Sequence, residues 1–423
     1  MTQLKSNFVN SENKANDTGK LIFPSGFLWG AATSAHQVEG NNHNDWSEWE
    51  KANAERLAKE AKDNWQPWQQ EKFPEMFEPQ NYISGRACDH YNRFAEDFDI
   101  AKSLGHNAHR FSIEWSRVEP EEGRFDQEAI EHYKKVVQAL RNKNIEPFFT
   151  INHLTLPFWF AERGGWQRVD SVFLFGRFVD KIANNFKDDV TFWITLNEPW
   201  IYLSHSFLRG IRPPQKKSIS LCLLILLNLI NAHKTAHNVI KSYNKQAKIG
   251  FAENFVCFEG WLSWFAHWWI DFRFLNSVRK RIDFLGVNYY FHSKIKGLKF
   301  SQNDNKKVSD LGWEIYPKGI YRILKRLKKY QKPIYILENG NADAEDEKRE
   351  RFIKDHLFWI HRAIRSGVDV RGYLYWSLLD NFEWEKGFWP RFGLVEVDHK
   401  TMERKIRPSA YKYAEICKNN SLN

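Results

Sequence analysis

The stretch Ile334-Tyr-Ile-Leu-Glu-Asn-Gly340 is a short apolar run that ends in a carboxylate, which predicts a buried strand with a polar group at its carboxyl end. Thr195-Leu-Asn-Glu-Pro-Trp200 has the same form, because Glu198 follows an apolar run and Pro199 then stops the strand. Functional groups of parallel α/β folds gather where strands end in this way. Glu198 and Glu338 are therefore predicted to lie at the carboxyl ends of two buried strands.

Six further apolar runs of similar length accompany them, and segments with helical periodicity lie between many of the runs. The eight candidate strands are Phe27–Ser34, Ala108–Ile113, Pro147–Asn152, Phe192–Asn197, Lys248–Asn254, Phe284–Asn288, Ile334–Glu338 and Gly372–Trp376. Gln127–Asn142 and Asp346–Ser366 are two of the candidate helices. Eight alternating units without a Pro- or Ser-rich linker predict one α/β domain over residues 21–423, a single (β/α)8 TIM barrel. A doubly wound open sheet is the alternative, but Phe27-Leu-Trp-Gly-Ala-Ala lacks the Gly-rich phosphate turn that it would need.

The net charge of +10 could indicate a nucleic-acid partner. The basic residues are spread along the chain apart from patches such as Arg279-Lys280-Arg281 and 322–329, and we interpret these patches as solvated helix faces. Nucleic-acid binding is the minor alternative. Four cysteines without metal-like spacing indicate a reducing compartment.

The N-terminal residues 1–20 are polar and lack the apolar run of a signal peptide, which predicts a disordered tail on a cytoplasmic protein. The most apolar stretch, Leu221–Ile230, is too short to cross a bilayer and is interrupted by Asn228. It predicts a buried helix. We therefore expect no membrane partner.

Chemically capable side chains stand where the predicted strands end. They are His153, Asn197, Glu198, Asn288, Glu338, Asn339 and Trp376. In a (β/α)8 barrel this end of the strands builds the active site. Glu198 and Glu338 end the fourth and seventh strands, on opposite sides of such a barrel. Cleavage of a glycosidic bond through a covalent intermediate needs two carboxylates about 5–5.5 Å apart, one as the nucleophile and the other as the acid and base.

Four segments resemble glycoside hydrolase family 1, the β-glucosidase and β-galactosidase barrels. They are Phe27-Leu-Trp-Gly-Ala-Ala-Thr-Ser-Ala-His-Gln-Val-Glu-Gly40, Asn197-Glu198-Pro199, Glu338-Asn339-Gly340 and Trp376-Ser-Leu-Leu-Asp-Asn-Phe-Glu-Trp384. The likeness runs from Phe23 to about Ala414. It implies a retaining β-glycosidase that hydrolyses terminal, non-reducing β-D-glucosyl residues, and also galactosyl or fucosyl residues, of a small-molecule or oligosaccharide β-glycoside.

The resemblance also implies a role for each matching residue. Glu338 would be the nucleophile and Glu198 the acid/base, with Arg110 and Tyr290 supporting the nucleophile. The substrate-binding residues would be Gln37, His153, Asn197, Asn288, Trp313, Trp376, Glu383, Trp384 and Phe392. Some of these have ordinary structural alternatives, since His153 or Trp376 could be core residues and Arg110 could form a structural ion pair. The implied chemistry needs no metal and no cofactor, because the carboxylates supply acid, base and nucleophile.

Glu383 narrows the substrate, because its carboxylate would repel a phosphate where the 6-phosphoglycosidases of the family carry a small residue. A neutral sugar is therefore expected. Two other functions remain open: a sugar-binding barrel without turnover, and a transglycosylase that shares the chemistry up to the intermediate. The oligomeric state is not predicted.

The sequence departs from the family pattern in three places. Leu154 and Leu337 stand where an aromatic residue and a threonine are usual, and the connection at 256–282 between the fifth and sixth strands is shortened. That connection holds eight aromatics: Phe258, Trp261, Trp264, Phe265, Trp268, Trp269, Phe272 and Phe274. We expect either an unusually open wall that admits a bulky aglycone or contacts a partner chain, or a wall in which these aromatics fold back and plug the gap.

Overall fold

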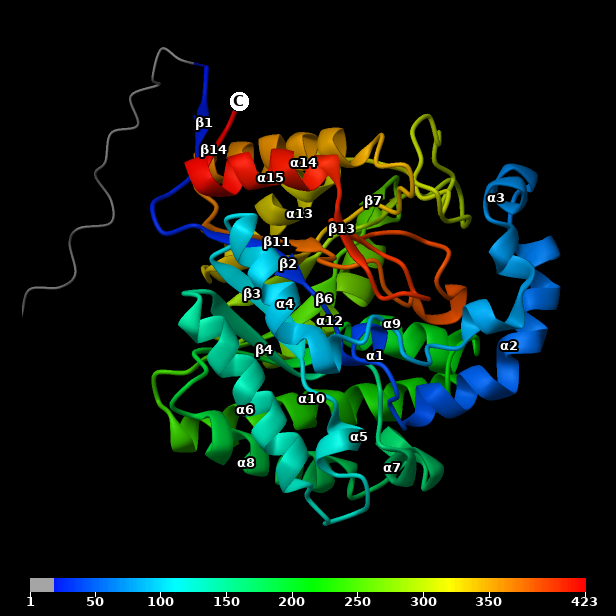
Figure 1. Ribbon diagram of the computed structural model, residues 1–423, viewed down its shortest axis with the longest axis vertical. Coiled ribbons are helices and arrows are strands. Elements are labelled where there is room, and N and C mark those ends of the chain that lie inside the picture. Colours follow the sequence, from blue (N-terminus) through cyan, green and yellow to red (C-terminus); the bar gives the residue numbers. More distant parts are fainter. Residues whose placement is uncertain (1–18) are drawn as a thin grey trace, which may run out of the picture.

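A closed barrel of eight parallel strands forms the centre of the computed structural model, which describes residues 19–423 (Figure 1). The strands are β2 (Leu28–Ala32), β3 (Ala108–Ser112), β4 (Glu146–Asn152), β5 (Phe192–Asn197), β6 (Lys248–Asn254), β8 (Leu285–Asn288), β10 (Ile334–Glu338) and β11 (Val370–Trp376). They close in the order β10-β11-β2-β3-β4-β5-β6-β8. The (β/α)8 barrel is thus confirmed, and the predicted strand ends differ by no more than two residues.

The inside of the barrel is filled with side chains rather than open. Phe148, Ile194, Phe284, Tyr335 and Leu374 are buried there in one cluster, and the Phe148 and Phe192 rings stack with centroids 4.4 Å apart. Because successive strand residues alternate between the barrel interior and the surrounding helices, most strand residues are buried whichever way they point. The packed interior forms the floor beneath the carboxyl ends of the strands.

Helices surround the barrel, with α14 and α15 at the top of Figure 1 and α8 and α10 at the bottom. The longer ones are α2 (Asp45–Asn64), α4 (His90–Ser103), α6 (Gln127–Asn142), α8 (Ser171–Phe186), α10 (Ile219–Tyr243), α13 (Lys318–Leu327), α14 (Arg349–Arg365) and α15 (Pro408–Asn419). The predicted helix at 127–142 is confirmed. The helix predicted at 346–366 is α14, which begins at Arg349, three residues later than predicted. It begins there because the Asp343 carboxylate accepts hydrogen bonds from the backbone N–H groups of Lys348 and Arg349.

Short elements complete the loops. They are α1 (Ala35–Val38), α3 (Pro67–Lys72), η1 (Pro74–Phe77), η2 (Pro79–Tyr82), α5 (Trp115–Val118), α7 (Phe158–Glu162), η3 (Gly165–Gln167), α9 (Pro199–Leu203), η4 (Ser204–Leu208), η6 (Lys328–Tyr330) and η7 (Trp384–Lys386). The strands β1 (Leu21–Ile22) and β14 (Ser421–Leu422) pair antiparallel and join the two ends of the described chain. A second small pair is β12 (Val395–Val397) with β13 (Arg404–Ile406). The predicted tail, 1–20, lies outside the described residues except for its last two positions.

The connection between β6 and β8 consists of β7 (Cys257–Glu259), α11 (Ser263–Ala266), the π-helical turn η5 (His267–Asp271) and α12 (Arg273–Val278). The strand β9 (His292–Lys294) follows β8 and pairs with β7. The longer α-helix of the connection, α12, has 6 residues, whereas α13 has 10 and α10 has 25. The wall is nevertheless covered, because Phe272 and Phe274 fold back into the core. Four aromatics of the connection remain exposed: Trp261, Trp264, Phe265 and Trp268. The alternative in which the aromatics fold back is thus confirmed for Phe272 and Phe274, whereas the open wall stays a prediction.

The apolar stretch at 221–230 belongs to α10, which is longer than expected. By length and composition α10 could span a membrane, with a mean hydropathy of 1.5 over an 18-residue window of which 44% is buried. It packs between α8 and α12 on the barrel wall, with Ile225 and Leu229 buried and Leu224 and Leu227 exposed. The prediction of a buried helix is thus correct for only one face, because the other face has no covering element among the described residues.

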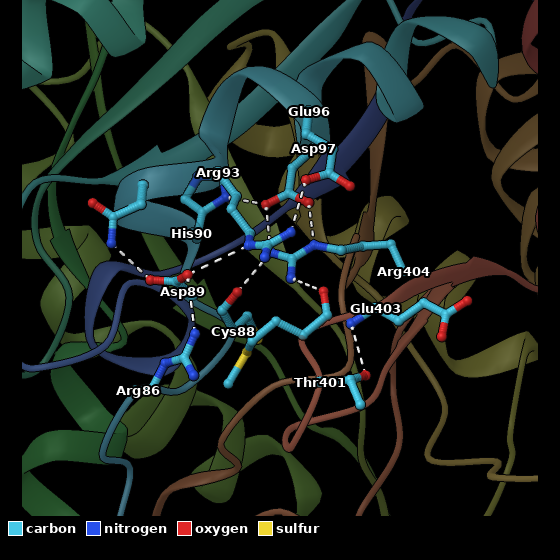
Figure 2. Close-up of polar contacts among 12 residues, drawn as sticks. Arg86, Cys88, Asp89, His90, Arg93, Glu96, Asp97, Thr401, Glu403 and Arg404 are labelled. Carbon is cyan, nitrogen blue, oxygen red and sulfur yellow. Dashed lines mark hydrogen bonds and ion pairs between the residues drawn. The ribbon is translucent and has the colours of Figure 1, made fainter.

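A buried ionic network ties α4 to the strand β13 near the C-terminal end of the chain (Figure 2). The guanidinium of Arg404 donates to both carboxylate oxygens of Asp97, at 2.9 and 3.2 Å, and to the carbonyl of Cys88 at 2.6 Å. His90 Nδ1 lies 2.7 Å from the same carboxylate. Burial raises the pKa of Asp97, but its contacts with His90 and Arg404 outweigh burial and hold the pKa below its usual value.

We expect Asp97→Asn to lower the free energy of unfolding by about 3–5 kcal/mol, because it leaves the Arg404 charge buried without its partner. Chemical denaturation of the two proteins measures the loss. Asp99→Asn on the same helix is the matched control, since Asp99 is 69% exposed and should change stability by less than about 0.5 kcal/mol. Equal stability of the two variants would contradict the assigned role of the network.

Candidate active site

A cavity of about 440 Å³ opens at the carboxyl ends of the barrel strands. Eleven of the thirteen predicted site residues line it: Gln37, His153, Asn197, Glu198, Tyr290, Trp313, Glu338, Trp376, Glu383, Trp384 and Phe392. The other two, Arg110 and Asn288, are fully buried directly behind the lining. Residues spread from position 37 to position 392 are thus brought to one place, because the strands and loops that carry them end on the same face of the barrel.

Glu338 ends β10 and is held by two side chains. Arg110 on β3 forms a buried ion pair with its Oε1, and the Tyr290 hydroxyl donates to its Oε2 at 2.9 Å. Arg110 is itself fixed, because it also donates to Asn197 Oδ1 at 2.6 Å and to Thr150 Oγ1 at 3.1 Å. Both contacts that the resemblance implied for the nucleophile are present.

Glu198 directly follows β5 and has a left-handed backbone conformation, with φ of +46°. This conformation is unfavourable for a residue with a side chain, and the following Pro199 disfavours it further. The position is held by the Glu198 N–H, which donates to the Ala252 carbonyl at 2.8 Å. The side-chain amide of Asn288 donates to Glu198 Oε1 at 2.8 Å. Such strain is characteristic of functional sites, where the surrounding structure fixes the backbone.

The two carboxyl groups differ in charge environment. Burial and then the negative charge of Glu338 raise the pKa of Glu198 to about 8. Burial also raises the pKa of Glu338 above its ordinary value, but Arg110 and the Tyr290 hydroxyl oppose this effect. Because only Glu338 has a cation in direct contact, it ionises first and Glu198 keeps its proton.

The inner part of the cavity combines fixed polar groups with aromatic faces. Gln37 donates to the Phe382 carbonyl at 2.8 Å, and the Asn197 amide lies 3.1 Å from His153 Nε2. The His153 ring lies nearly parallel to the rings of Trp376 and Trp384, at 6.0 and 6.1 Å between centroids. Burial and the neighbouring Arg110 charge lower the pKa of His153 well below its usual range, so that its ring is neutral.

Glu383 lines the cavity with a carboxylate oxygen that lacks a hydrogen-bond partner among the described residues. This oxygen, Oε2, is buried. Burial raises the pKa of Glu383 to about 7, against the opposing charges of Lys386 and Arg212. A buried carboxylate oxygen without a partner is costly, and a ligand hydroxyl would relieve that cost.

The outer part of the cavity is aromatic. Trp313 packs with Phe291, at 4.6 Å between centroids, and with Phe392 at 6.1 Å. The ammonium of Lys386 lies 5.7 Å from the centre of the Trp313 ring. This places Trp313 where the resemblance implied a platform.

Gly340, two residues after Glu338, is not among the residues with positive φ, so its backbone conformation does not require a glycine. Instead, a Cβ at this position would lie 1.8 Å from the carbonyl oxygen of Trp376. The glycine is needed because the end of β10 approaches the end of β11 too closely for any side chain.

Several lining residues were not predicted: Arg56, Glu60, His205, Arg209, Arg212, Asn254, Glu385 and Lys386. Asn254 could have been found from the sequence, because it ends β6 as Asn197 ends β5. In the structure its Oδ1 has no partner among the described residues. The buried ion pair of Arg212 with Glu385, at 2.7 Å, joins positions 173 residues apart and had no local signal.

The three departures from the family pattern lie away from the cavity lining. Leu154 is buried in a left-handed conformation with φ of +74°, and Leu337 packs inside the barrel. None of the eight aromatics at 256–282 is among the lining residues. The structure therefore does not place those aromatics against a substrate in this cavity.

A closed (β/α)8 barrel with a carboxylate pair at its mouth, one member paired to arginine and the other protonated, defines a glycosidase. A model of glycosyl hydrolase family 1 matches residues 20–259 and 271–422. The chain belongs to glycosyl hydrolase family 1.

Relatives with known activities support this membership. The chain is 34% identical to "Beta-glucosidase A" of Thermotoga maritima over 460 residues, covering 95% of this chain and 98% of the relative. It is 29% identical to a "Beta-galactosidase" of Sulfolobus acidocaldarius over 488 residues, covering 95% and 96%. A solved structure, "Beta-glucosidase from Thermotoga maritima in complex with glucoimidazole", superposes with a TM-score of 0.82 at 32% identity, covering 95% of this chain and 99% of that chain.

Proposed function

We propose that this chain is a retaining β-glycosidase that hydrolyses terminal, non-reducing β-D-glucosyl residues, and also β-D-galactosyl and β-D-fucosyl residues. The observation that carries the proposal is the asymmetry of the pair: Glu338 is ion-paired to the buried Arg110, whereas Glu198 has no direct cationic contact and a pKa of about 8. One carboxylate is thereby suited to attack and the other to donate a proton.

In the first step a Glu338 oxygen attacks the anomeric carbon while Glu198 gives its proton to the glycosidic oxygen, and the bond to the leaving group breaks. In the second step Glu198 takes a proton from water, and the resulting hydroxide displaces Glu338 from the anomeric carbon. Two inversions retain the configuration. Asn197, fixed by Arg110 at 2.6 Å, is suited to contact the 2-hydroxyl, where hydrogen bonds strengthen at the transition state.

The early products of hydrolysis test the proposal. With aryl β-D-glucoside, galactoside and fucoside, proton NMR should detect the β-anomer of the free sugar before mutarotation. First formation of the α-anomer would show an inverting enzyme and refute the mechanism. Absence of turnover on all three glycosides would favour a sugar-binding protein instead, and glycosyl transfer to an added acceptor would reveal transglycosylation.

The pH dependence follows from the pKa shifts of the pair. The active form has Glu338 ionised and Glu198 protonated, so kcat/KM should fall as pH rises through about 8, where Glu198 loses its proton. On the acid side kcat/KM should fall as Glu338 becomes protonated, at a pH above the ordinary range of a glutamate because burial raises its pKa. A profile of kcat/KM against pH for a small aryl glucoside measures both limbs. An alkaline limb absent up to pH about 10 would contradict the assigned acid.

Glu383 should make the enzyme select neutral sugars. Its unpartnered Oε2 would accept a hydrogen bond from a sugar hydroxyl, whereas a 6-phosphate at the same place would meet a buried carboxylate. We expect Glu383→Ser to lower kcat/KM on an aryl β-glucoside by about 10²-fold or more and to reduce the preference over the 6-phosphate. Glu396→Ser, at an exposed carboxylate on β12, is the matched control and should leave both rates unchanged. An unchanged preference in Glu383→Ser would refute this role.

The substrate is expected to be a small-molecule or oligosaccharide β-glycoside, with the aglycone resting on Trp313. The "Beta-galactosidase" among the relatives supports a galactosyl as well as a glucosyl substrate. The four cysteines are buried and free, which fits the proposal of a cytoplasmic protein in a reducing compartment.

A further inference from the structure

Six large apolar side chains project into solvent from two neighbouring loops, and we name them the aromatic face: Trp261, Trp264, Phe265, Trp268, Leu298 and Phe300. Trp261, Trp264 and Leu298 are 68%, 67% and 81% exposed. Side chains that line a groove would be partly covered by its walls. The aromatic face is therefore a projecting surface rather than a cleft.

The two loops are joined at their base. β7 pairs in parallel with β9, and a Cβ on Gly260 would lie 2.4 Å from the carbonyl oxygen of Ile295. Phe258, at the root of the first loop, lies 6.1 Å from the ring of Phe300 on the second. Beneath them Phe258, Ala266 and Ile295 form a small core of their own. This core supports the aromatic face from below.

Basic side chains border the aromatic face. Lys296 and Lys299 are exposed on the loop of Leu298, and Arg273 lies 4.0 Å from the centre of the Trp269 ring. Further basic side chains lie behind this surface: α13 packs against β7, and the ammonium of Lys329, just beyond α13, lies 4.7 Å from the centre of the buried Phe272 ring.

This part of the chain also carries the net charge. Residues 256–332 hold 16 Lys and Arg against 6 Asp and Glu, a net of +10, which equals the net charge of the whole protein. The basic residues are spread along the chain, but the net positive charge comes from this segment, because positive and negative charges balance elsewhere. A segment that combines this excess of positive charge with exposed apolar rings favours an anionic partner.

Nothing in the glycosidase site accounts for this surface. The aromatic face does not line the cavity, and residues 260–270 are the internal stretch that the family model leaves unmatched. Exposed tryptophans lower stability and solubility unless they contact something. The aromatic face is therefore a feature of this chain beyond the shared catalytic barrel.

We propose that the aromatic face and its bordering lysines and arginines dock on an anionic lipid bilayer. Tryptophan and phenylalanine rings partition into the boundary between headgroups and acyl chains, and nearby lysines are attracted to anionic headgroups. This proposal revises the sequence-based expectation of no membrane partner, and it is independent of the proposed reaction.

The charge and ring geometry favour a bilayer over other partners. A symmetric dimer through this surface would bring two positive faces together. A neutral polysaccharide would not use the charge, and the rings do not form a flat platform, since Trp264 and Phe265 are inclined by 76° and Phe265 and Trp268 by 37°. A single-stranded nucleic acid would be held along a groove between stacked rings. The projecting Leu298 also fits a lipid phase better than a base.

Vesicle co-sedimentation of the full chain tests the proposal. The protein should bind vesicles of phosphatidylcholine with phosphatidylglycerol, bind vesicles of phosphatidylcholine alone at least about tenfold more weakly, and lose most of its binding near 1 M salt, where the Debye length is about 3 Å. Equal binding to both vesicle types, or binding to neither, would overturn it.

Two variants and their controls locate the contact. Lys296→Glu/Lys299→Glu should weaken binding by about 30-fold or more, because each lysine contributes about fivefold near an anionic surface. Trp264→Ala/Trp268→Ala should weaken it at least about tenfold by removing interfacial rings. The controls are Lys102→Glu/Lys135→Glu on α4 and α6 and Trp68→Ala on α3, all at exposed positions. Turnover of a small aryl glucoside, where the enzyme has it, or otherwise an unchanged circular dichroism spectrum, verifies folding.

Other partners would give distinct results, each of which overturns the proposal. A dimer that the Trp264→Ala/Trp268→Ala variant abolishes, in a protein that does not bind vesicles, would assign the face to self-association. Binding of a single-stranded oligonucleotide or of an insoluble β-glucan with the same variant dependence, again without vesicle binding, would assign it to those polymers. Vesicle binding that both surface variants retain in full would place the contact elsewhere.

Discussion

Replacement of Glu338 by alanine should lower kcat on an aryl β-glucoside by about 10⁴-fold or more, because it removes the group that forms the covalent intermediate. Arg110 and Tyr290 would then surround an empty space rather than a carboxylate. A small anion can occupy that space and attack the anomeric carbon. We therefore expect azide to restore part of the rate and to yield the α-glycosyl azide, which the wild type does not form.

The control for this variant is Glu396→Ala, which removes an exposed carboxylate on β12 and should leave kcat unchanged. Steady-state rates with and without azide, followed by NMR of the product, measure both parts of the expectation. A Glu338→Ala protein with a rate within about tenfold of the wild type would assign the nucleophile to another residue. Rescue that produces the β-glycosyl azide would also assign the nucleophile to another residue, because the azide would then be attacking a covalent intermediate that still forms.

Replacement of Glu198 by alanine should have an effect that depends on the leaving group. For a substrate with a poor leaving group, kcat/KM should fall by about 10²–10⁴-fold, because no proton reaches the glycosidic oxygen. For a substrate such as a dinitrophenyl glycoside, whose leaving group needs no proton, formation of the intermediate should be almost unaffected. Its hydrolysis would still be slow, since the same residue activates water, and the intermediate should accumulate.

Burst kinetics with the dinitrophenyl glycoside and mass spectrometry of the accumulated glycosyl-enzyme measure this pattern. The alkaline limb of the pH profile should also disappear in Glu198→Ala, because the group with the pKa of about 8 is gone. Added azide should here yield the β-glycosyl azide, opposite to the product expected for Glu338→Ala. An equal loss on good and poor leaving groups would contradict the role of Glu198 as the acid.

The barrel could be predicted because its signals are local. The strands are short and mostly apolar, and six of the eight end in a polar residue. Ile334–Glu338 and Phe192–Asn197 were placed to the residue. The polar residues at strand ends then converge automatically, since parallel strands of a closed barrel end on one face. Glu198, Glu338 and eleven further site residues were predicted from those strand ends together with the family motifs, and all of them line the cavity or lie buried behind it. None of these predictions required the three-dimensional distance between two residues.

Features that depend on the packing of distant segments could not be predicted. The Arg212–Glu385 pair joins two loops far apart in sequence, and the reason for Gly340 lies in the backbone of Trp376. The left-handed conformation of Glu198 is likewise held by a neighbouring strand. Such contacts leave no pattern along the chain, because the sequence around one residue does not indicate which distant residue it contacts.

The connection at 256–282 shows where this division lies. The sequence by itself determined that the connection is short, rich in aromatics and followed by basic segments. Only the tertiary structure decided that Phe258, Phe272 and Phe274 turn inward while Trp261, Trp264 and Trp268 remain in solvent. The physical reason is that burial depends on the space left by other elements. The wall beside α10 and α12 has room for some of these rings and no more, so Phe265 stays exposed whereas Phe272 is buried.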